Sequence, residues 1–153
     1  MQSASSPSPN SQSAAVSDSG APFGMGVMLL DDEVAYIDLL QQLLGEHLAC
    51  PVHSFSRPAA ALAALPTLNV GLIVTDYHMP GMDGLEFLTA VQAIKPHLPA
   101  VMITAHEIEL GVGRAARVAA LKAVVRKPFK WTALAEEINR YWMGSRPPFP
   151  FVR

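Results

Sequence analysis

The sequence predicts an α/β domain in which five parallel strands alternate with five helices. Short, almost wholly apolar runs recur along the chain, and the segments between them carry apolar residues at helical spacing. Strands without a polar face are typical of a parallel sheet that is covered on both sides. Right-handed crossovers between such strands give a doubly wound sandwich of three layers. Half of the 153 residues are hydrophobic, which is enough for one packed core.

Five segments have the pattern of strands. Val27–Leu30 and Val70–Thr75 are the most strongly apolar, and the others are expected at Pro51–Phe55, Pro99–Ile103 and Ala123–Val125. The proline that begins the second strand cannot donate a backbone hydrogen bond. We therefore expect that strand at an edge of the sheet.

The segments between and after the strands predict helices at Val34–Leu48, Arg57–Leu65, Leu85–Ile94, Glu109–Leu121 and Trp131–Trp142. Asp83 is the expected N-cap of the third helix, and Asp32 or Glu33 is expected at the N-terminus of the first helix. Gly111 and Gly113 weaken the start of the fourth.

The two ends of the chain differ in composition from the middle. Residues 1–22 contain eight Ser and three Pro, and we expect them to be disordered because they cannot bury enough apolar surface. Residues 25–143 form the predicted domain. Residues 144–153 form a Pro/Phe-rich tail that is either loose or docked on its own domain or on a partner.

Composition bounds the function. A net charge of −2 gives no basic excess, so we expect no direct contact with nucleic acid. The N-terminus lacks the pattern of a secretory signal, and no apolar run is long enough to span a membrane. Cys50 is the single cysteine, which fits a reducing compartment. We therefore expect a cytoplasmic protein.

Polar residues stand where the predicted strands end. Asp31 and Asp32 follow the first strand, Asp76 the third, Thr104 the fourth and Lys127 the fifth. The carboxyl ends of parallel strands meet at one edge, where ligands bind at the point at which strand order reverses. Clustered carboxylates need a cation, and hard oxygen ligands favour Mg²⁺. A lysine and a hydroxyl beside that ion suit phosphoryl oxygens.

Four motifs in order resemble those of response-regulator receiver domains of the CheY-like superfamily. They are Leu30–Glu33 (LDDE), Asp76–Gly84 (DYHMPGMDG), Ile103–Ala105 (ITA) and Lys127–Phe129 (KPF). Each motif alone is weak, whereas the four together over about residues 25–143 are specific. The resemblance implies a stand-alone receiver with a flavodoxin-like (βα)5 sandwich and the strand order 2-1-3-4-5.

The resemblance also implies roles for individual residues. Asp76 would be the phosphoacceptor, and Lys127 and Thr104 would contact the phosphoryl group. Asp32, Asp76 and the backbone carbonyl of His78 would bind Mg²⁺, and Asp31 would do so through a water. The bond between Lys127 and Pro128 would be cis.

Three residues near these motifs raise separate questions. His78 and His106 occupy positions that the resemblance assigns to access and phosphoryl lifetime; with the carboxylates they could instead form a softer transition-metal site. Receivers usually carry Tyr or Phe three residues before the lysine, where this chain has Val124. Valine has little rotamer range, so the aromatic part of the switch is in doubt.

The resemblance implies a phosphorelay switch and not an enzyme with turnover. Its partners would be a histidine kinase or histidine phosphotransfer protein, and a downstream protein. No output domain fits after residue 143, so the output would be protein contact, dimerisation or phosphate relay to another histidine protein. A homodimer could form through the face of the fourth helix, fifth strand and fifth helix, with Ala115, Val118 and Trp131 as candidate contacts if they are not core.

Two alternatives remain open from the sequence. A pseudo-receiver that works without phosphorylation is compatible with Val124. A phosphatase of the haloacid-dehalogenase type also uses Asp, Mg²⁺, Thr and Lys. In that family, however, the nucleophile lies in the first strand and the acidic pair comes last, whereas here the acidic pair comes first.

Overall fold

A five-stranded parallel sheet forms the centre of the molecule. The structure, a computed structural model, describes residues 24–108, 113–145 and 147–149. The strands are β1 Gly26–Leu30, β2 Val52–Phe55, β3 Val70–Asp76, β4 Ala100–Thr104 and β5 Leu121–Arg126. They lie in the order β2-β1-β3-β4-β5 and every pair is parallel. The predicted fold class and strand order are confirmed, as is the edge position of β2.

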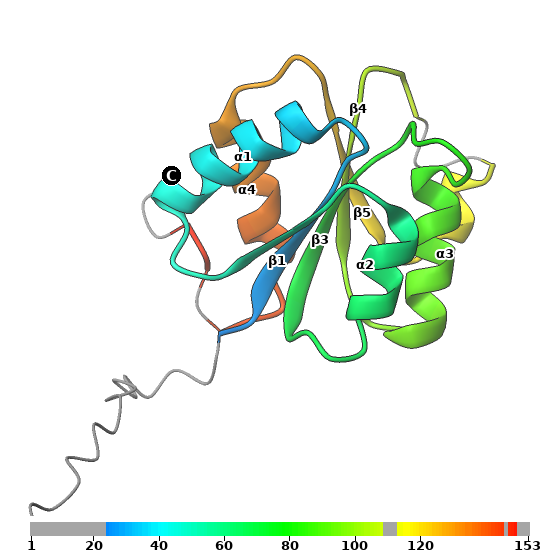
Figure 1. Cartoon of the computed structure of the whole chain (residues 1–153), viewed down its shortest axis with the longest axis horizontal. Helices are drawn as coiled ribbons and strands as arrows, with labels where there is room; N and C mark the ends of the chain where they lie inside the picture. The colour runs from blue at the N-terminus through cyan, green and yellow to red at the C-terminus, as the bar shows by residue number, and fades with distance from the viewer. Residues whose placement is uncertain (1–23, 109–112, 146, 150–153) are drawn as a thin grey trace, which may run out of the picture.

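Helices cover both faces of this sheet (Figure 1). They are α1 Val34–His47, α2 Pro58–Ala64, α3 Gly84–Ile94 and α4 Trp131–Tyr141. One buried cluster lies beneath α2 and α3 and includes Phe87 and Leu88, both fully buried. The other lies beneath α1 and α4 and includes Leu44 and Ile138. The sheet is thus the middle layer of three.

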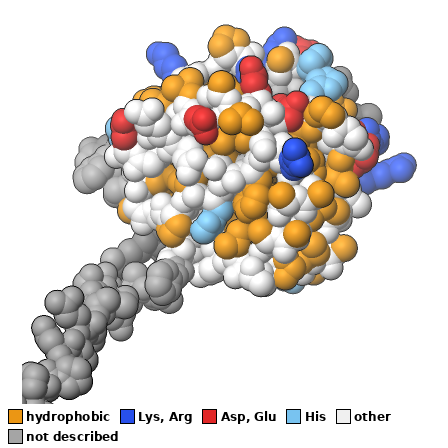
Figure 2. All heavy atoms as spheres, in the orientation of Figure 1, with side chains coloured by type: hydrophobic (Ala, Val, Ile, Leu, Met, Phe, Trp, Pro, Cys, Tyr) orange, Lys and Arg blue, Asp and Glu red, His pale blue; other side chains and the backbone are white. Residues whose placement is uncertain are grey.

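The helix α2 carries no charged side chain. The helix reads PAAALAA, and apolar atoms gather over α2 and α3 in Figure 2. Within the described residues, no helix is both long and apolar enough to cross a bilayer.

Capping differs between the first and third helices. The Asp83 side chain accepts a hydrogen bond from the Glu86 amide at 2.9 Å, which confirms Asp83 as the N-cap of α3. At α1 the N-cap position is Glu33, and its side chain makes no capping bond. Glu33 thus occupies the predicted cap position, but neither Asp32 nor Glu33 supplies a side-chain capping bond. Asp31 instead accepts the Glu33 amide at 3.0 Å, so the carboxylate that follows β1 is bonded to the start of α1.

The predicted helix from Glu109 to Leu121 is wrong in its described part. Residues 109–112 lie outside the described residues, and from 113 onward there is only one 3₁₀ turn, η1, Ala115–Arg117. Gly113 has a φ of +70°, which a right-handed helix does not allow. Leu121 already pairs with Ala100 in the sheet, so the residues before it are drawn into an extended path. The sandwich has four α-helices among the residues described.

Side-chain contacts hold this connection between β4 and β5 to its neighbours. Arg114 pairs with Asp83 at 2.9 Å, and the Gln92 side chain accepts the Ala120 amide at 3.0 Å. Ala115 and Val118 are both buried in the cluster beneath α3. They are core residues and not the exposed partner contacts that the sequence left open. The predicted homodimer stays a prediction, and the described part of its face carries η1 in place of a fourth regular helix.

The C-terminal segment returns to the domain after α4. Phe149 is 1 % exposed and belongs to the cluster beneath α1 and α4. Of the alternatives for the tail, Pro148 and Phe149 dock on their own domain, so a loose tail is wrong for these two residues. The disorder predicted for residues 1–22 falls outside the described residues.

Candidate functional site

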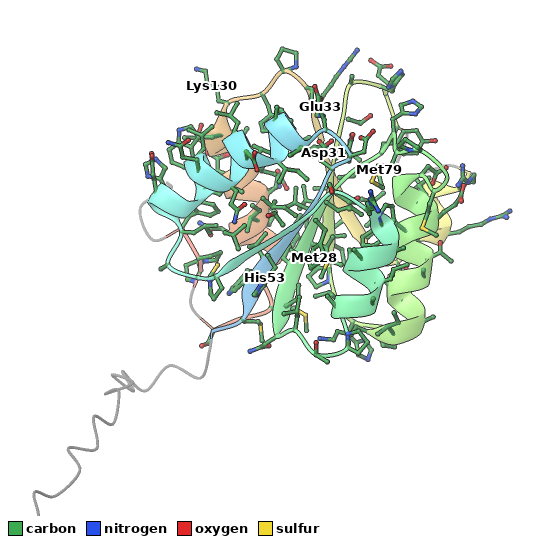
Figure 3. All side chains as sticks on the ribbon, viewed as in Figure 1. Met28, Asp31, Glu33, His53, Met79 and Lys130 are labelled. Atoms are coloured by element: carbon green, nitrogen blue, oxygen red, sulfur yellow. The ribbon has the colours of Figure 1, made fainter. Side chains whose placement is uncertain are left out.

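The carboxyl ends of four strands bring the predicted site residues to one edge of the sheet. Leu30 of β1 is level with Thr75 of β3, so the next residues, Asp31 and Asp76, lie side by side. On the other flank the register pairs Thr104 of β4 with Arg126 of β5. Figure 3 shows Asp31 at this end of the sheet, close to Glu33 and Met79. This is the edge at which strand order reverses between β1 and β3.

A close approach of the backbone shapes the wall of this crevice. A Cβ atom on Gly84 would lie 2.5 Å from the Asp76 carbonyl oxygen, so only glycine fits there. The Gly84 amide donates to the Tyr77 carbonyl at 2.8 Å. The loop between β3 and α3 is therefore tight, because the start of α3 at Gly84 lies against the backbone of Asp76 and Tyr77.

Three carboxylates converge in the crevice. Asp31, Asp32 and Asp76 each offer an oxygen, and these oxygens lie within 4.8 Å of one another. Asp31 and Asp76 are buried, at 2 % and 8 % exposure, whereas Asp32 is exposed. Burial raises the pKa of Asp31 from 3.8 to about 6, opposed by the Glu33 amide and Lys127. Burial also raises the pKa of Asp76.

A lysine ammonium partly offsets this negative charge. Lys127 Nζ lies 3.3 Å from Asp31 Oδ2 and 3.8 Å from Asp76 Oδ1. The same ammonium lies 4.1 Å from the centroid of the Tyr36 ring, a cation–π contact. Sequence reasoning missed Tyr36. Its position in the first turn of α1, after the acidic pair, is the only signal that could have found it.

Backbone bonds fix the positions of these groups. The Tyr77 amide donates to Asp76 Oδ1 at 2.8 Å, which fixes one oxygen of that carboxylate. The Lys127 amide donates to the Thr104 carbonyl at 2.8 Å, so the start of the β5–α4 loop is held beside β4. The bond between Lys127 and Pro128 is cis, as the resemblance implies.

Thr104 and two histidines line the other side of the mouth. The Thr104 side chain is buried, and its hydroxyl accepts the His106 amide at 3.0 Å. The exposed rings of His78 and His106 meet edge to face with centroids 4.5 Å apart. Among the described residues, the only group of three or more ligands that could hold a metal is the Asp trio. The histidines do not join it, so the softer mixed site is not formed.

Val124 sits where the motif pattern would place an aromatic ring. It pairs with Met102 in the sheet and packs, half-buried, against the cluster beneath α3. No ring can therefore swing between exposed and buried positions at this point of β5.

Comparison with known proteins agrees with this geometry. The family model described as the response regulator receiver domain matches residues 27–139. The chain belongs to the response regulator receiver family. All four motif regions that line the crevice lie within this match. The receiver family is one of phosphoacceptor switches and not of enzymes with turnover, which removes the phosphatase alternative.

Individual relatives include short and long proteins. The receiver is 31% identical over 118 residues to the chemotaxis protein CheY of Pseudomonas aeruginosa, covering 76% of this chain and 94% of that one. It is 34% identical over 124 residues to the response regulator protein FleR of the same species, covering 79% of this chain. The matched part is a quarter of FleR. The receiver is thus similar both to a single-domain protein and to part of a larger one.

Solved structures show the same fold. The chemotaxis protein CheY4 of Vibrio cholerae superposes with a TM-score of 0.69 at 24% identity, covering 76% of this chain and 98% of that one. A CheY-like receiver from Methanospirillum hungatei superposes with a TM-score of 0.68 at 22% identity, covering 76% and 91%. These likenesses concern the fold alone, and the crevice is what connects the chain to chemistry.

Proposed function

We propose that this receiver accepts a phosphoryl group on Asp76 from a phosphohistidine of a histidine kinase or histidine phosphotransfer protein. The observation that carries the proposal is the meeting of three carboxylates with the Lys127 ammonium in one crevice. The receiver motifs assign the acceptor role to Asp76. The Tyr77 amide holds its Oδ1, and the second carboxylate oxygen would act as nucleophile. We also place the chain in the cytoplasm, where kinases draw phosphoryl groups from ATP.

The crevice fits a Mg²⁺ ion. Its donors are hard carboxylate oxygens. Burial raises the pKa of Asp31 and Asp76, so a cation that replaces the lost water would stabilise their charged forms. Asp32, Asp76 and the backbone carbonyl of His78 would hold the ion directly, and Asp31 would hold it through a water. When bound, the ion would neutralise carboxylate charge and the charge of the incoming phosphoryl group.

The protein's own residues then account for the transfer. An oxygen of Asp76 forms a bond to phosphorus while the bond from phosphorus to the imidazole nitrogen breaks. That nitrogen keeps the electron pair, and because the other ring nitrogen of the phosphohistidine carries a proton, the products are an acyl phosphate and a neutral histidine. Lys127 lies within 3.8 Å of Asp76 and would pair with a phosphoryl oxygen. The Thr104 hydroxyl accepts a bond from His106, so its own proton remains available to donate. Positioning and charge thus supply most of the catalysis.

The output we propose is contact with a downstream protein. Thr104 is the residue that would respond to phosphorylation by contacting the phosphoryl group. In the described part of the segment after it, one 3₁₀ turn precedes β5, and Val124 offers no aromatic switch. Movement of the connection between β4 and β5 is therefore the change a partner would detect. The His78 and His106 rings at the mouth would control how water reaches the acyl phosphate.

Intact-mass spectrometry tests the proposal. The wild-type chain, treated with acetyl phosphate and Mg²⁺, should gain a single phosphoryl adduct, and Asp76→Asn should gain none. Asp38→Asn, an exposed carboxylate on the surface of α1, is the matched control and should behave like the wild type. Chelation of the metal should slow adduct formation strongly.

An unchanged wild-type mass under these conditions, with the fold intact by circular dichroism, would favour the pseudo-receiver alternative. An adduct that persists in Asp76→Asn would place the phosphoryl group on another residue.

A further inference from the structure

The C-terminal segment fills a groove between α1 and α4. After α4 the chain runs through Trp142 and Met143, and Pro148 and Phe149 are then buried again. Phe149 joins the buried cluster whose helical members include Leu44 of α1 and Ile138 of α4. Its ring lies 6.3 Å from the Trp131 ring, centroid to centroid. The Phe149 side chain therefore covers the buried cluster beneath α1 and α4.

The groove binds the backbone of the segment as well as its ring. The Asn139 side-chain amide donates to the Phe149 carbonyl at 2.9 Å and accepts the Phe149 amide at 3.0 Å. The Ala49 amide donates to the Pro148 carbonyl at 2.9 Å. Three polar groups on two consecutive residues are thus paired with groups of the helices and their ends. This is how a protein recognises an extended peptide: backbone bonds give affinity and a pocket selects one side chain.

Contacts between the two helices form the walls of the groove. α1 and α4 contact each other directly. His47 at the end of α1 stacks on Trp131 at the start of α4, with ring centroids 4.2 Å apart and planes within 3°. The Trp131 ring also lies beside Phe149, so one side chain contacts both the other helix and the segment.

The link between the domain and the bound residues is thin. Met143 is 49% exposed, and Ser145 and Pro147 are exposed too. The receiver family match ends at residue 139, so the segment lies beyond it while both helices of the groove lie within it. Beyond the Met143 amide, which donates to the Gly71 carbonyl at 3.4 Å, the described part of the segment is held to the domain through Pro148 and Phe149.

We propose that the groove between α1 and α4 is a peptide-recognition site whose ligand is the chain's own Pro148–Phe149 segment. The segment leaves the groove while the domain stays folded, and it uncovers a site for a proline–aromatic peptide. The proposal does not depend on the phosphoryl chemistry at Asp76, because none of its contacts involves the crevice.

Native-state hydrogen exchange of the unmodified chain tests the detachment. The Phe149 and Ala49 amides are bonded across the contact between segment and groove, so both should exchange at least about 100-fold faster than the amides of Leu29 and Val74 in the central strands. Exchange at the rate of the strand amides would mean that the segment leaves only when the whole domain unfolds, and it would overturn the proposal.

Binding in trans tests the recognition. A labelled, end-capped peptide of residues 144–150 is titrated by fluorescence anisotropy into full-length Phe149→Ala. Saturable binding is expected there, and binding to the wild type should be at least about tenfold weaker because its own segment occupies the groove. A peptide with Ala in place of its Phe should not bind, and neither should the peptide bind to Asn139→Ala/Phe149→Ala.

Met143→Ala, a change in the exposed link, is the matched control and should behave like the wild type. Absence of saturable binding to folded Phe149→Ala, or failure of Phe149→Ala to fold, would show that Phe149 is an integral part of the core and would overturn the proposal.

Discussion

The acidic crevice and the groove between α1 and α4 share the helix α1 but bury different kinds of side chain, charged in the crevice and apolar in the groove. At its start α1 places Tyr36 beneath the Lys127 ammonium, and further along it contributes Leu40 and Leu44 to the groove. The groove buries apolar side chains and pairs the backbone groups of Pro148 and Phe149. The crevice buries carboxylates whose pKa values are raised, which means that burial disfavours their charged forms.

This difference separates stability from function within one small domain. The groove lowers the free energy of the folded chain by hydrophobic burial. The crevice raises it when no cation or phosphoryl group is bound, because buried charge is then only partly compensated. Substitutions in the two regions should therefore change stability in opposite directions.

The largest effect is expected at the floor of the groove. Leu44 is fully buried, so Leu44→Ala should lower the free energy of unfolding by about 2–5 kcal/mol, measured by urea denaturation. Leu39 lies on the same helix but is 52% exposed, and Leu39→Ala should change it by about 0.5 kcal/mol or less. Equal losses of unfolding free energy in the two variants would mean that the buried side of α1 stabilises the domain no more than its exposed side does.

A smaller effect of opposite sign is expected at Asp31. Its folded pKa of about 6 exceeds the unfolded value of 3.8, so between these values the folded chain keeps a proton that the unfolded chain releases. Without divalent ions, the free energy of unfolding should therefore fall as pH rises from 4 to 6. The contribution of Asp31 to this fall should be on the order of 2 kcal/mol.

Asp31→Asn isolates this contribution, because it keeps an oxygen for the Glu33 amide and cannot ionise. Relative to the wild type, the variant should gain stability between pH 4 and pH 7. A parallel pH dependence of the two proteins would contradict the raised pKa.

The smallest effect is the response to Mg²⁺. An ion that binds only the folded chain should add about 1.4 kcal/mol at ten times its dissociation constant, seen as a shift of the urea midpoint. Leu44→Ala should show the same increment as the wild type, since the groove is separate from the crevice. Asp32→Asn should show less. An undiminished increment in Asp32→Asn would place the ion elsewhere.

Local patterns were enough to predict most of the fold. The short apolar runs at Val27–Leu30 and Val70–Thr75 form strands. Such runs have no polar face, which is typical of parallel strands that are buried on both sides. Asp83 caps α3 because its side chain reaches an amide three residues on. The crevice residues followed from strand ends, since a parallel sheet brings its carboxyl ends to one edge.

Longer-range effects decided what the patterns missed. Apolar residues between Glu109 and Leu121 suggested a helix. From residue 113 onward, where the structure describes the chain, the φ of Gly113 and the pairing of Leu121 with Ala100 limit regular structure before β5 to η1. The contact of Tyr36 with Lys127 joins residues far apart in the sequence, and no local pattern predicts such a pair.

The amino-acid sequence by itself determined the alternation of strands and helices and the identity of the acidic residues, because both depend on side chains close together along the chain. Only the tertiary structure decided which buried charges share the Lys127 ammonium, and that Phe149 enters a groove bridged by His47 and Trp131. Those outcomes depend on how separate elements meet in space, and packing settles that only when all of them are present.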